Sequence, residues 1–514
     1  MKVGGGTSTR NGYNNDYSSM LGSWTKEGGN DDFDPLFVGS GDYHLQSDSP
    51  CIDVGDNSAP QIQNDDFEGN PRIVDGDVDG NAIVDMGADE YGTILYVKTD
   101  GVDPTDCGGG TNWETAFRTI TKAEQCASPG DEIWVKQGVY YPSSDYVYVG
   151  KTVGIYGGFA GTETSRNQRD WQENETSVDG GASGRGFLIM TDCILDGFTI
   201  ANGQMNYGGG IYVSGGTPTI TNCTLSGNTA NTSGGGIYNT ASSIIINCSF
   251  SGNEAGDGAG IYNSNSEPSI TNCSFSGNTA SGGQGGGIYN NASDAVISHC
   301  TFSGNEANRG GGIYNYHSEP IITNCIITGC KALVDGGGIF NGEQCYNAVM
   351  TNCTLSGNTA TDSGGGIYDQ WGDLTITNCI LWGNEASDGA EIYIFVGSPT
   401  ITYSDIGGGT GESWFGTGCL DADPQFSDSG YWDNNGTPGE PSDDFWVNGD
   451  YHLRISSPCI DTGTNSAAGL PVTDFEGDDR IVDGDRDGSA TVDMGADEYA
   501  LKGAISPLLL LLLD

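Results

Sequence analysis

The chain has 514 residues, of which 85 are glycine, and its formal net charge is −51, from 69 acidic and 18 basic residues. Such a surface repels nucleic acid and anionic membranes, because phosphate binding needs clustered lysine and arginine, and it attracts divalent cations instead. Glycine stands well above its usual share of about 7% without a collagen-like three-residue period, which indicates tight turns at short intervals.

We expect neither end of this sequence to be a targeting or membrane segment, and both ends to be cut from a longer chain. The start, Met1–Gly6, lacks the apolar core of a signal peptide. The six leucines Leu508–Leu513 are too few to span a bilayer, which needs about 20 apolar residues. From composition we expect an extracellular or cell-surface location, with no membrane span and no nucleic-acid partner.

A large duplication sets the domain boundaries. The segments Gly41–Leu45 and Asp85–Tyr91 recur as Gly449–Leu453 and Asp493–Tyr499, both at an offset of 408 residues. Residues 1–92 are therefore expected to be the tail and cap of one unit, followed by a whole second unit. In that second unit we expect an N-terminal cap with the first coils at 93–186, repeat coils at 187–418, an acidic C-terminal cap at 419–500 and a tail at 501–514.

A shorter repeat fills the middle of the second unit. The motif Gly-Gly-Gly-Ile-Tyr occurs first at Gly208–Tyr212 and is repeated several times, with the last copy starting at Gly364. A second motif, such as Ile270–Asn278, lies between its copies. The period is too short for a propeller blade and has no helical pattern. Short alternating runs split by glycine and asparagine are strand and turn signals. Each repeat is therefore expected to form one coil, of about 25 residues, of an all-β, right-handed parallel β-helix.

Stacked coils bring equivalent residues together at the strand spacing of about 4.8 Å. Ile270, Cys273 and Phe275 are expected to point inward, with Asn272 at the bend. One asparagine of each repeat is expected to join a buried ladder of hydrogen-bonded amides, because buried amides are tolerated only when satisfied. The ladder comprises Asn228, Asn253, Asn278, Asn305, Asn358 and Asn384, and Cys330 interrupts it.

The paired motifs Gly285–Ile288 and Phe302–Asn305 resemble the repeats of chlamydial polymorphic outer membrane proteins. More widely, the chain resembles bacterial pectin-lyase-like β-helix proteins with a choice-of-anchor C-terminal region. That resemblance implies a short amphipathic helix over residues 112–126 that covers the N-terminal end of the coils. It is specific for the fold and weak for function, because adhesins and carbohydrate enzymes share this architecture.

The cysteines divide into two groups. Those of the repeat are spaced 25 to 28 residues apart and are expected to be buried thiols, because their parallel Cβ vectors would strain a chain of disulfides. This group comprises Cys223, Cys248, Cys273, Cys300, Cys325, Cys353 and Cys379. The better disulfide candidates are Cys107 with Cys126, Cys330 with Cys345, and Cys419 with Cys459.

The tyrosine of each Gly-Gly-Gly-Ile-Tyr motif is expected to face outward. A stripe of stacked tyrosines stabilises a sheet, and it also offers a platform on which sugar rings can stack. We take both roles as open. The stripe comprises Tyr212, Tyr238, Tyr262, Tyr289, Tyr314 and Tyr368.

The two copies of the acidic cap carry the strongest chemical motif. Each places aspartates at alternate positions before a glycine, as at the start of an EF-hand-type loop, and so predicts a structural calcium site of weak affinity. An exposed acidic turn is the alternative. The expected ligands are Asp75, Asp77, Asp79 and Asp85 in the first cap, and Asp483, Asp485, Asp487 and Asp493 in the second. The equivalent histidines His44 and His452 are expected to pack in the caps rather than to bind metal.

Catalytic residues are sparse on the coils. Lyases of this fold use a basic residue, and Arg309 and Lys331 are the only basic residues between Arg185 and Arg454. A small site would need neighbours such as His317, Glu319 and Asp335. Hydrolases need paired carboxylates, for which Asp369 and Asp373 near Trp371 are candidates.

No coil concentrates several such groups, so no residue is assigned a catalytic role. We expect a non-catalytic adhesion or glycan-binding protein whose partner is a polysaccharide or a cell surface. A carbohydrate-active enzyme and a structural spacer of a surface fibre remain the alternatives.

Overall fold

The computed structural model describes residues 93–499 apart from 143, 182 and 436–444, together with the backbone of two antiparallel strands, β1 (Phe37–Gly39) and β2 (Asp42–Leu45). The chain forms two compact units. One comprises Met1–Tyr140, Tyr148–Thr176 and Met190–Phe198, and the other comprises Tyr141–Val147, Ser177–Ile189 and Thr199–Asp514.

In the first unit, four parallel strands pair in the order β3, β4, β7, β10. Their bounds are Ile94–Val97, Glu132–Lys136, Gly154–Phe159 and Ile194–Asp196. The unit also holds β5 (Gly138–Tyr140), the 3-10 turn Arg166–Gln168 and most of β6 (Val147–Val149).

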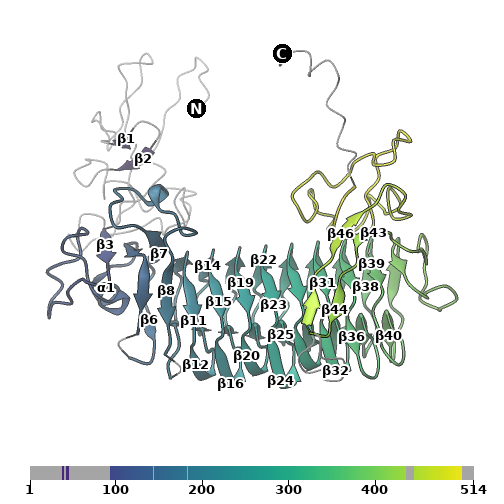
Figure 1. Ribbon diagram of the computed structural model, residues 1–514, viewed down its shortest axis with the longest axis horizontal. Helices are drawn as coiled ribbons and strands as arrows, with labels where there is room; N and C mark the ends of the chain where they lie inside the picture. The colour runs from purple at the N-terminus through teal and green to yellow at the C-terminus, as the bar shows by residue number, and fades with distance from the viewer. Residues whose placement is uncertain are drawn as a thin grey trace, which may run out of the picture. The chain divides into compact units, whose positions relative to one another are not determined.

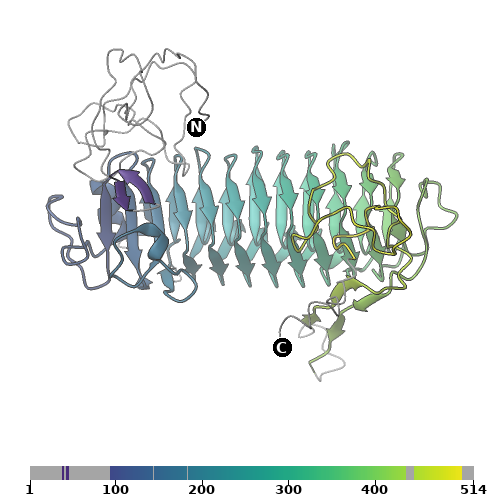
Figure 2. The ribbon, with the colours of Figure 1, turned by 90° about the horizontal axis from the view of Figure 1, so that it is seen from above.

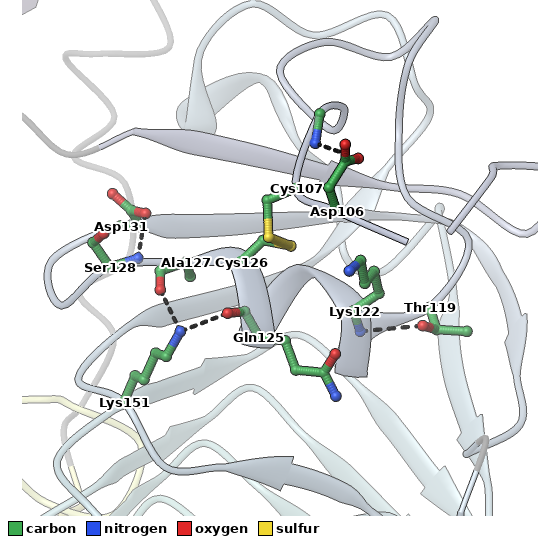
Figure 3. The surroundings of a disulfide bond; sticks show 11 residues. Asp106, Cys107, Thr119, Lys122, Gln125, Cys126, Ala127, Ser128, Asp131 and Lys151 are labelled. Carbon is green, nitrogen blue, oxygen red and sulfur yellow. Dashed lines mark hydrogen bonds between the residues drawn. A yellow bond between two sulfur atoms is a disulfide. The ribbon is translucent and has the colours of Figure 1, made fainter. Parts of the chain in front are cut away.

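The helix of the first unit, α1, spans Ile120–Cys126 and is shorter than the expected 112–126. It begins late because Phe117 is held in a parallel bridge with Val97 of β3. Thr119 then caps the helix by accepting a hydrogen bond from the Lys122 N–H. Figure 3 shows this cap beside the disulfide between Cys107 and Cys126, which confirms the first expected cysteine pair.

In the second unit the coils contribute short strands, up to four each, which line up from coil to coil in parallel sheets (Figures 1 and 2). The first sheet has β14 (Thr219–Thr221), β18 (Ile244–Ile246), β22 (Ser269–Thr271), β26 (Val296–Ser298), β30 (Ile321–Thr323), β34 (Val349–Thr351), β38 (Thr375–Thr377) and β41 (Thr400–Thr402). The second sheet has β8 (Thr176–Asp179), β11 (Thr199–Ala201), β15 (Thr224–Ser226), β19 (Ser249–Ser251), β23 (Ser274–Ser276), β27 (Thr301–Ser303), β31 (Ile326–Thr328), β35 (Thr354–Ser356), β39 (Ile380–Trp382) and β42 (Asp405–Ile406).

The third and fourth sheets complete each coil. The third has β12 (Gln204–Tyr207), β16 (Thr229–Ser233), β20 (Glu254–Asp257), β24 (Thr279–Gln284), β28 (Glu306–Arg309), β32 (Lys331–Asp335) and β36 (Thr359–Ala360). The fourth has β9 (Phe187–Ile189), β13 (Ile211–Val213), β17 (Ile237–Asn239), β21 (Ile261–Ser264), β25 (Ile288–Asn291), β29 (Ile313–Tyr316), β33 (Ile339–Asn341), β37 (Ile367–Asp369) and β40 (Ile392–Ile394). The expected fold class, an all-β parallel solenoid, is confirmed.

Local sequence explains why each coil turns where it does. Ile270, Cys273 and Phe275 are at most 2% exposed, as expected. Asn272 stands between β22 and β23 with φ 53°, and Gly277 follows β23 with φ 60°. Asparagine and glycine tolerate this left-handed conformation better than other residues do, so they mark the corners. The rings of successive coils stack, and the Phe275 centroid lies 4.7 Å from those of Phe250 and Phe302.

The expected asparagine ladder is also confirmed. The side-chain oxygen of Asn278 accepts hydrogen bonds from the N–H and the side-chain amide of Asn253, at 3.1 and 2.9 Å. Its own amide donates to the Phe250 carbonyl and to the Asn305 side-chain oxygen, at 3.0 and 2.8 Å. Every polar atom of the buried side chain is thus satisfied.

Cys330 replaces an asparagine at one position of this ladder, and hydrogen bonds of the neighbouring asparagines compensate for the change. The Cys330 N–H still donates to the Asn358 side-chain oxygen at 2.9 Å. The Asn305 amide, facing the thiol at 3.8 Å, keeps its second bond to the Phe275 carbonyl at 2.9 Å. The substitution therefore weakens one amide contact and leaves no buried donor alone.

The repeat cysteines are free and buried, as expected. The pairs Cys330 with Cys345 and Cys419 with Cys459 were wrong, because all four are free thiols. Each thiol has a local partner instead: Cys459 Sγ, for example, lies 3.2 Å from an Asp405 side-chain oxygen.

The C-terminal region folds back onto the coils of its own unit. Two antiparallel pairs begin it, β43 (Phe426–Asp428) with β46 (Asp450–Leu453) and β44 (Tyr431–Asp433) with β45 (Phe445–Val447). Three successive corner asparagines then hold the cap, an arrangement we call the cap clasp. Its bonds join Asn324 Oδ1 to Arg480 Nη2 at 2.7 Å, Asn352 Nδ2 to the Asp493 carbonyl at 3.2 Å, and Asn378 Nδ2 to the Thr464 carbonyl at 3.1 Å.

Candidate functional site

The expected tyrosine stripe is a continuous ladder of rings on the fourth sheet. Phe340 fills the gap between Tyr314 and Tyr368, and Tyr393 extends the ladder by one coil. Neighbouring ring centroids lie 4.7 to 5.3 Å apart from Tyr212 to Tyr393. The sequence motif did not include Phe340 or Tyr393, although both occupy the position after an isoleucine that the tyrosines share.

The ladder is less exposed than the sequence predicted. Tyr314 and Phe340 are buried, at 8% and 3% exposure, and the other rings are partly buried. Stacked pairs such as Tyr238 with Tyr262, 7° apart, cover one another's faces. Burial raises the pKa of Tyr262 to about 12, so that its hydroxyl stays protonated and can donate.

A cavity of about 660 Å³ opens where the ladder ends. Tyr393, Phe395 and Trp414 supply aromatic surface to it, and Phe395 is 57% exposed. The carboxylates of Asp388, Glu391 and Glu412 also line it. A concave site that combines aromatic rings with a few polar groups is typical of ligand binding. Sequence reasoning missed it because its residues come from two separate segments, one around β40 and one from Gly407 to Trp414.

Glu391 joins this cavity to the asparagine ladder. It stands where the repeat has a glycine, and its carboxylate accepts from the Asn384 side-chain amide at 2.5 Å and from the Asn384 N–H at 3.2 Å. Glu391 thereby takes the place of the next amide in the ladder. Burial raises the pKa of Glu391 to about 7, although the bonds from Asn384 lower it in part.

The acidic motif of the second cap forms a carboxylate cluster with a membership different from the expected one. Oxygen atoms of Asp461, Asp483 and Asp485 lie within 4.8 Å of one another. Asp487 instead accepts from the Ser489 N–H, in a local turn. Burial and the neighbouring carboxylates raise the pKa of Asp461. Asp461 belongs to the duplicated Ser-Pro-Cys-Ile-Asp motif. The recurrence of this aspartate at Asp53 is the sequence signal from which its role in the cluster could have been predicted.

Asp493 lies apart from this cluster, in the interior of the cap. It is 0% exposed and accepts from the N–H groups of Asp461 and Tyr499 at 2.7 Å. Burial raises its pKa to about 7, and the pKa of its neighbour Glu498 rises for the same reason. Arg480, buried with them 3.6 Å from Glu498, offsets part of this cost. Asp493 therefore supports the loop through these bonds and is not one of the three clustered aspartates.

The basic residues of the coils form ion pairs. Arg309 lies 3.2 Å from Asp335, and Lys331 lies 3.6 Å from Glu306, all on β28 and β32 of the third sheet. His317 follows β29 of the fourth sheet and faces Glu343 at 4.0 Å. Glu319, after the same strand, accepts from the Asn347 amide at 2.8 Å. The structure thus keeps Arg309, Lys331 and Asp335 together on the third sheet. It places His317 and Glu319 after a strand of the fourth sheet.

The aspartates near Trp371 do not form an accessible pair either. Asp369 is 0% exposed at the end of β37, and neither of its side-chain oxygens has a hydrogen-bond partner in the described part of the chain. Burial raises its pKa to about 7, partly offset by the nearby N–H groups of Gly372 and Leu374. Asp373 is exposed. A substrate cannot reach the Asp369 carboxyl.

His452 is 50% exposed, so it is not the packing residue expected from sequence. Three carboxylates surround its ring, those of Asp450, Glu476 and Asp497. In the first cap, the equivalents of Asp450 and His452 are Asp42 and His44 on β2, of which only the backbone is described. The expected ligands Asp75, Asp77, Asp79 and Asp85 lie outside the described residues.

These features define a solenoid with an aromatic face and an acidic cap, and the comparisons with known proteins agree on the coil. The family model of the right-handed β-helix region matches residues 164–318 and 271–411. These residues lie in the coils, which form an all-β parallel solenoid consistent with a right-handed β-helix, as the sequence predicted. None of the curated proteins matches it in sequence.

Two solved structures align with most of the chain. Pectate lyase Pel9A aligns at 14% identity and a TM-score of 0.49, over 79% of this chain and 96% of that chain. A rhamnogalacturonan lyase aligns at 12% identity and a TM-score of 0.20, over 82% and 98%. At these TM-scores neither alignment carries an activity over to this chain. No helix in the described part of the chain is long and apolar enough to cross a membrane.

Proposed function

We propose that the protein is an extracellular or cell-surface solenoid that binds a glycan without cleaving it. One observation carries the proposal: the ladder that begins at Tyr212 ends at Tyr393, which also lines the cavity with Trp414. Repeated hydroxyl donors followed by an aromatic cavity match a long polymer of hydroxyl groups and apolar ring faces. The disulfide between Cys107 and Cys126 supports an oxidising location.

The charge of the protein favours a neutral polysaccharide. A net charge of −51 repels polyanions over the Debye length of about 8 Å at physiological salt. Neutral polysaccharides are not repelled in this way, and their hydroxyl groups can still form hydrogen bonds with the tyrosine hydroxyls and with the carboxylates of the cavity. Retention on neutral polysaccharides is therefore expected to exceed retention on acidic ones at low salt.

The test is affinity electrophoresis of the full chain in gels containing single polysaccharides. The Trp414→Ala variant is expected to lower affinity about 10- to 100-fold, by the loss of one aromatic contact worth about 1–3 kcal/mol. Tyr431→Ala serves as the control, since Tyr431 is 54% exposed on β44 and lies outside the ladder and the cavity lining. If Trp414→Ala and the parent chain are retained equally, the cavity does not take part in binding. If the parent chain is not retained on any polysaccharide, the protein is better explained as a structural spacer.

A glycoside hydrolase is the second candidate, and Glu391 favours it. A buried carboxyl with a pKa of about 7 in a cavity can protonate a glycosidic oxygen near neutral pH. Release of reducing ends from a bound polysaccharide, abolished by Glu391→Gln, would establish this activity. The glutamine retains one acceptor oxygen for the Asn384 side-chain amide, so this bond of the ladder end can be kept. Binding without release supports the non-catalytic protein.

We further propose that Ca²⁺ binds the cap at Asp461, Asp483 and Asp485. Clustered carboxylate oxygens suit this hard cation, with a Kd of about 10⁻⁴–10⁻³ M expected for a site of the extracellular class. In calorimetry, Asp483→Asn is expected to bind one Ca²⁺ fewer than the parent chain. The exposed Asp362 on the coils provides the matched control, Asp362→Asn. Unchanged stoichiometry in Asp483→Asn would show that the cluster is only an acidic turn.

A further inference from the structure

A second group of ligand atoms in the cap is chemically different from the aspartate cluster. His452, on β46, directs its ring Nε2 toward Glu476 Oε2 at 3.3 Å and Asp497 Oδ1 at 4.0 Å. One ligand atom from each of the three residues lies within 4.8 Å of the others. Asp497 is largely buried, with 14% of its side chain exposed, while the other two are half-exposed. An imidazole nitrogen and two carboxylates thus converge from three segments of the chain.

The orientation of the imidazole is fixed from its other side. Asp450 stands two residues before His452 on β46, so both side chains lie on one face of the strand. The Asp450 carboxylate pairs with His452 Nδ1. This partner holds the Nδ1 proton and leaves Nε2 for a ligand, which is the arrangement found around metal-binding histidines.

The duplication supplies an independent observation. Residues 41–92 and 449–500 align without a gap, and 17 of the 52 positions differ between them. All four residues of the group are unchanged. Their counterparts in the first cap are Asp42, His44, Glu68 and Asp89. Half-exposed residues are free to vary unless something requires them, as the change from Gln46 to Arg454 nearby illustrates.

We propose that His452, Glu476 and Asp497 bind a divalent transition-metal ion, with Zn²⁺ as the best match, and that Asp450 positions the histidine. Imidazole suits Zn²⁺ rather than Ca²⁺, and three protein ligands leave one tetrahedral position for water. The ion joins β46 to the loop at Glu476 and to the segment at Asp497. Its role is to lock the end of the cap onto the strand where the cap begins.

The test is calorimetric titration of the full chain with ZnCl₂, in a buffer that does not chelate metals and with Ca²⁺ in excess to occupy the aspartate cluster. His452→Gln is expected to bind one Zn²⁺ fewer than the parent chain. His317→Gln, on the coils beside Glu343, is the matched control and is expected to bind as the parent does. Asp450→Asn is expected to keep the stoichiometry and weaken binding about 10- to 100-fold.

A second measurement separates loss of the site from loss of the fold. The chain has only four histidines, so ¹⁵N-histidine NMR resolves each ring. On addition of Zn²⁺ the Nε2 signal of His452 is expected to shift while that of His317 stays unchanged. Equal Zn²⁺ binding by the parent chain and a folded His452→Gln, or no shift at His452, would overturn the proposal and leave His452 as the centre of an ion-pair cluster.

Discussion

Replacing Asn278 by alanine is expected to lower the free energy of unfolding of the coils by about 3–5 kcal/mol. The change removes four hydrogen bonds of a fully buried amide and leaves the Asn253 N–H without its acceptor. Burying an unsatisfied donor costs about 1–3 kcal/mol, and the cavity adds to it. Urea unfolding followed by circular dichroism measures the change.

The same substitution at an exposed asparagine provides the control. Asn231 on β16 donates to Asn206 at 3.0 Å, in a pair open to solvent. Asn231→Ala is expected to change the unfolding free energy by less than about 0.5 kcal/mol. Similar losses for the two variants would mean that the buried ladder contributes no more than a surface pair.

Replacing Asp369 by asparagine is expected to stabilise the protein, and increasingly so as pH rises. A second amide ladder runs from Asn239 through Asn263, Asn290 and Asn315 to Asn341, with side-chain bonds of 2.8 to 3.0 Å. The next register position is Asp369. An asparagine there continues the ladder and removes a carboxyl whose charge the core disfavours.

The sign of the pH effect follows from the raised pKa of Asp369. The folded chain binds the proton up to about pH 7, whereas the unfolded chain releases it near 3.8. The carboxyl therefore supports folding fully below about pH 4, and this support is lost as pH rises to about 7. A pKa moved from 3.8 to about 7 corresponds to at most about 4 kcal/mol.

The advantage of Asp369→Asn over the parent chain should accordingly grow between pH 4 and pH 7 and level off above it. Thermal unfolding across this range measures it. Asp373→Asn, at an exposed carboxylate four residues away, is the control. Its charge only adds to the effect of burial on the pKa of Asp369, so a much smaller trend is expected. A constant difference between Asp369→Asn and the parent chain would mean that Asp369 ionises normally in the folded state.

The coil was predictable from sequence because its determinants are local and repeated. Each repeat places an inward Ile270 or Phe275 and a corner Asn272 at fixed spacing, and stacking then follows from strand geometry. The helix start was not predictable, since it depends on the bridge between Phe117 and Val97, which are 20 residues apart.

The candidate sites were only partly predictable for the same reason. The aspartates of one loop are visible in a motif, but Asp461 reaches them only after the cap has folded. The cavity at Tyr393 and the group around His452 likewise combine segments that no single motif contains. Burial explains the remaining differences: the sequence predicted Asp493 as a calcium ligand and Asp369 as a candidate of a carboxylate pair, yet both are 0% exposed.

The cap clasp has a consequence for how such a protein can change in length over evolution. Each coil upstream of Asn324 bonds to its two neighbours in the same repeating pattern. Inserting or deleting a coil there therefore leaves the bonds of the clasp intact. Between Asn324 and Asn378 the number of coils is fixed, because Arg480, Asp493 and Thr464 bond to three successive corner asparagines. Gene duplications that lengthen the solenoid are therefore expected upstream of the coils that the C-terminal region contacts, which reach back to Ser303, bonded to Asn448. From there to Asn378 they are penalised.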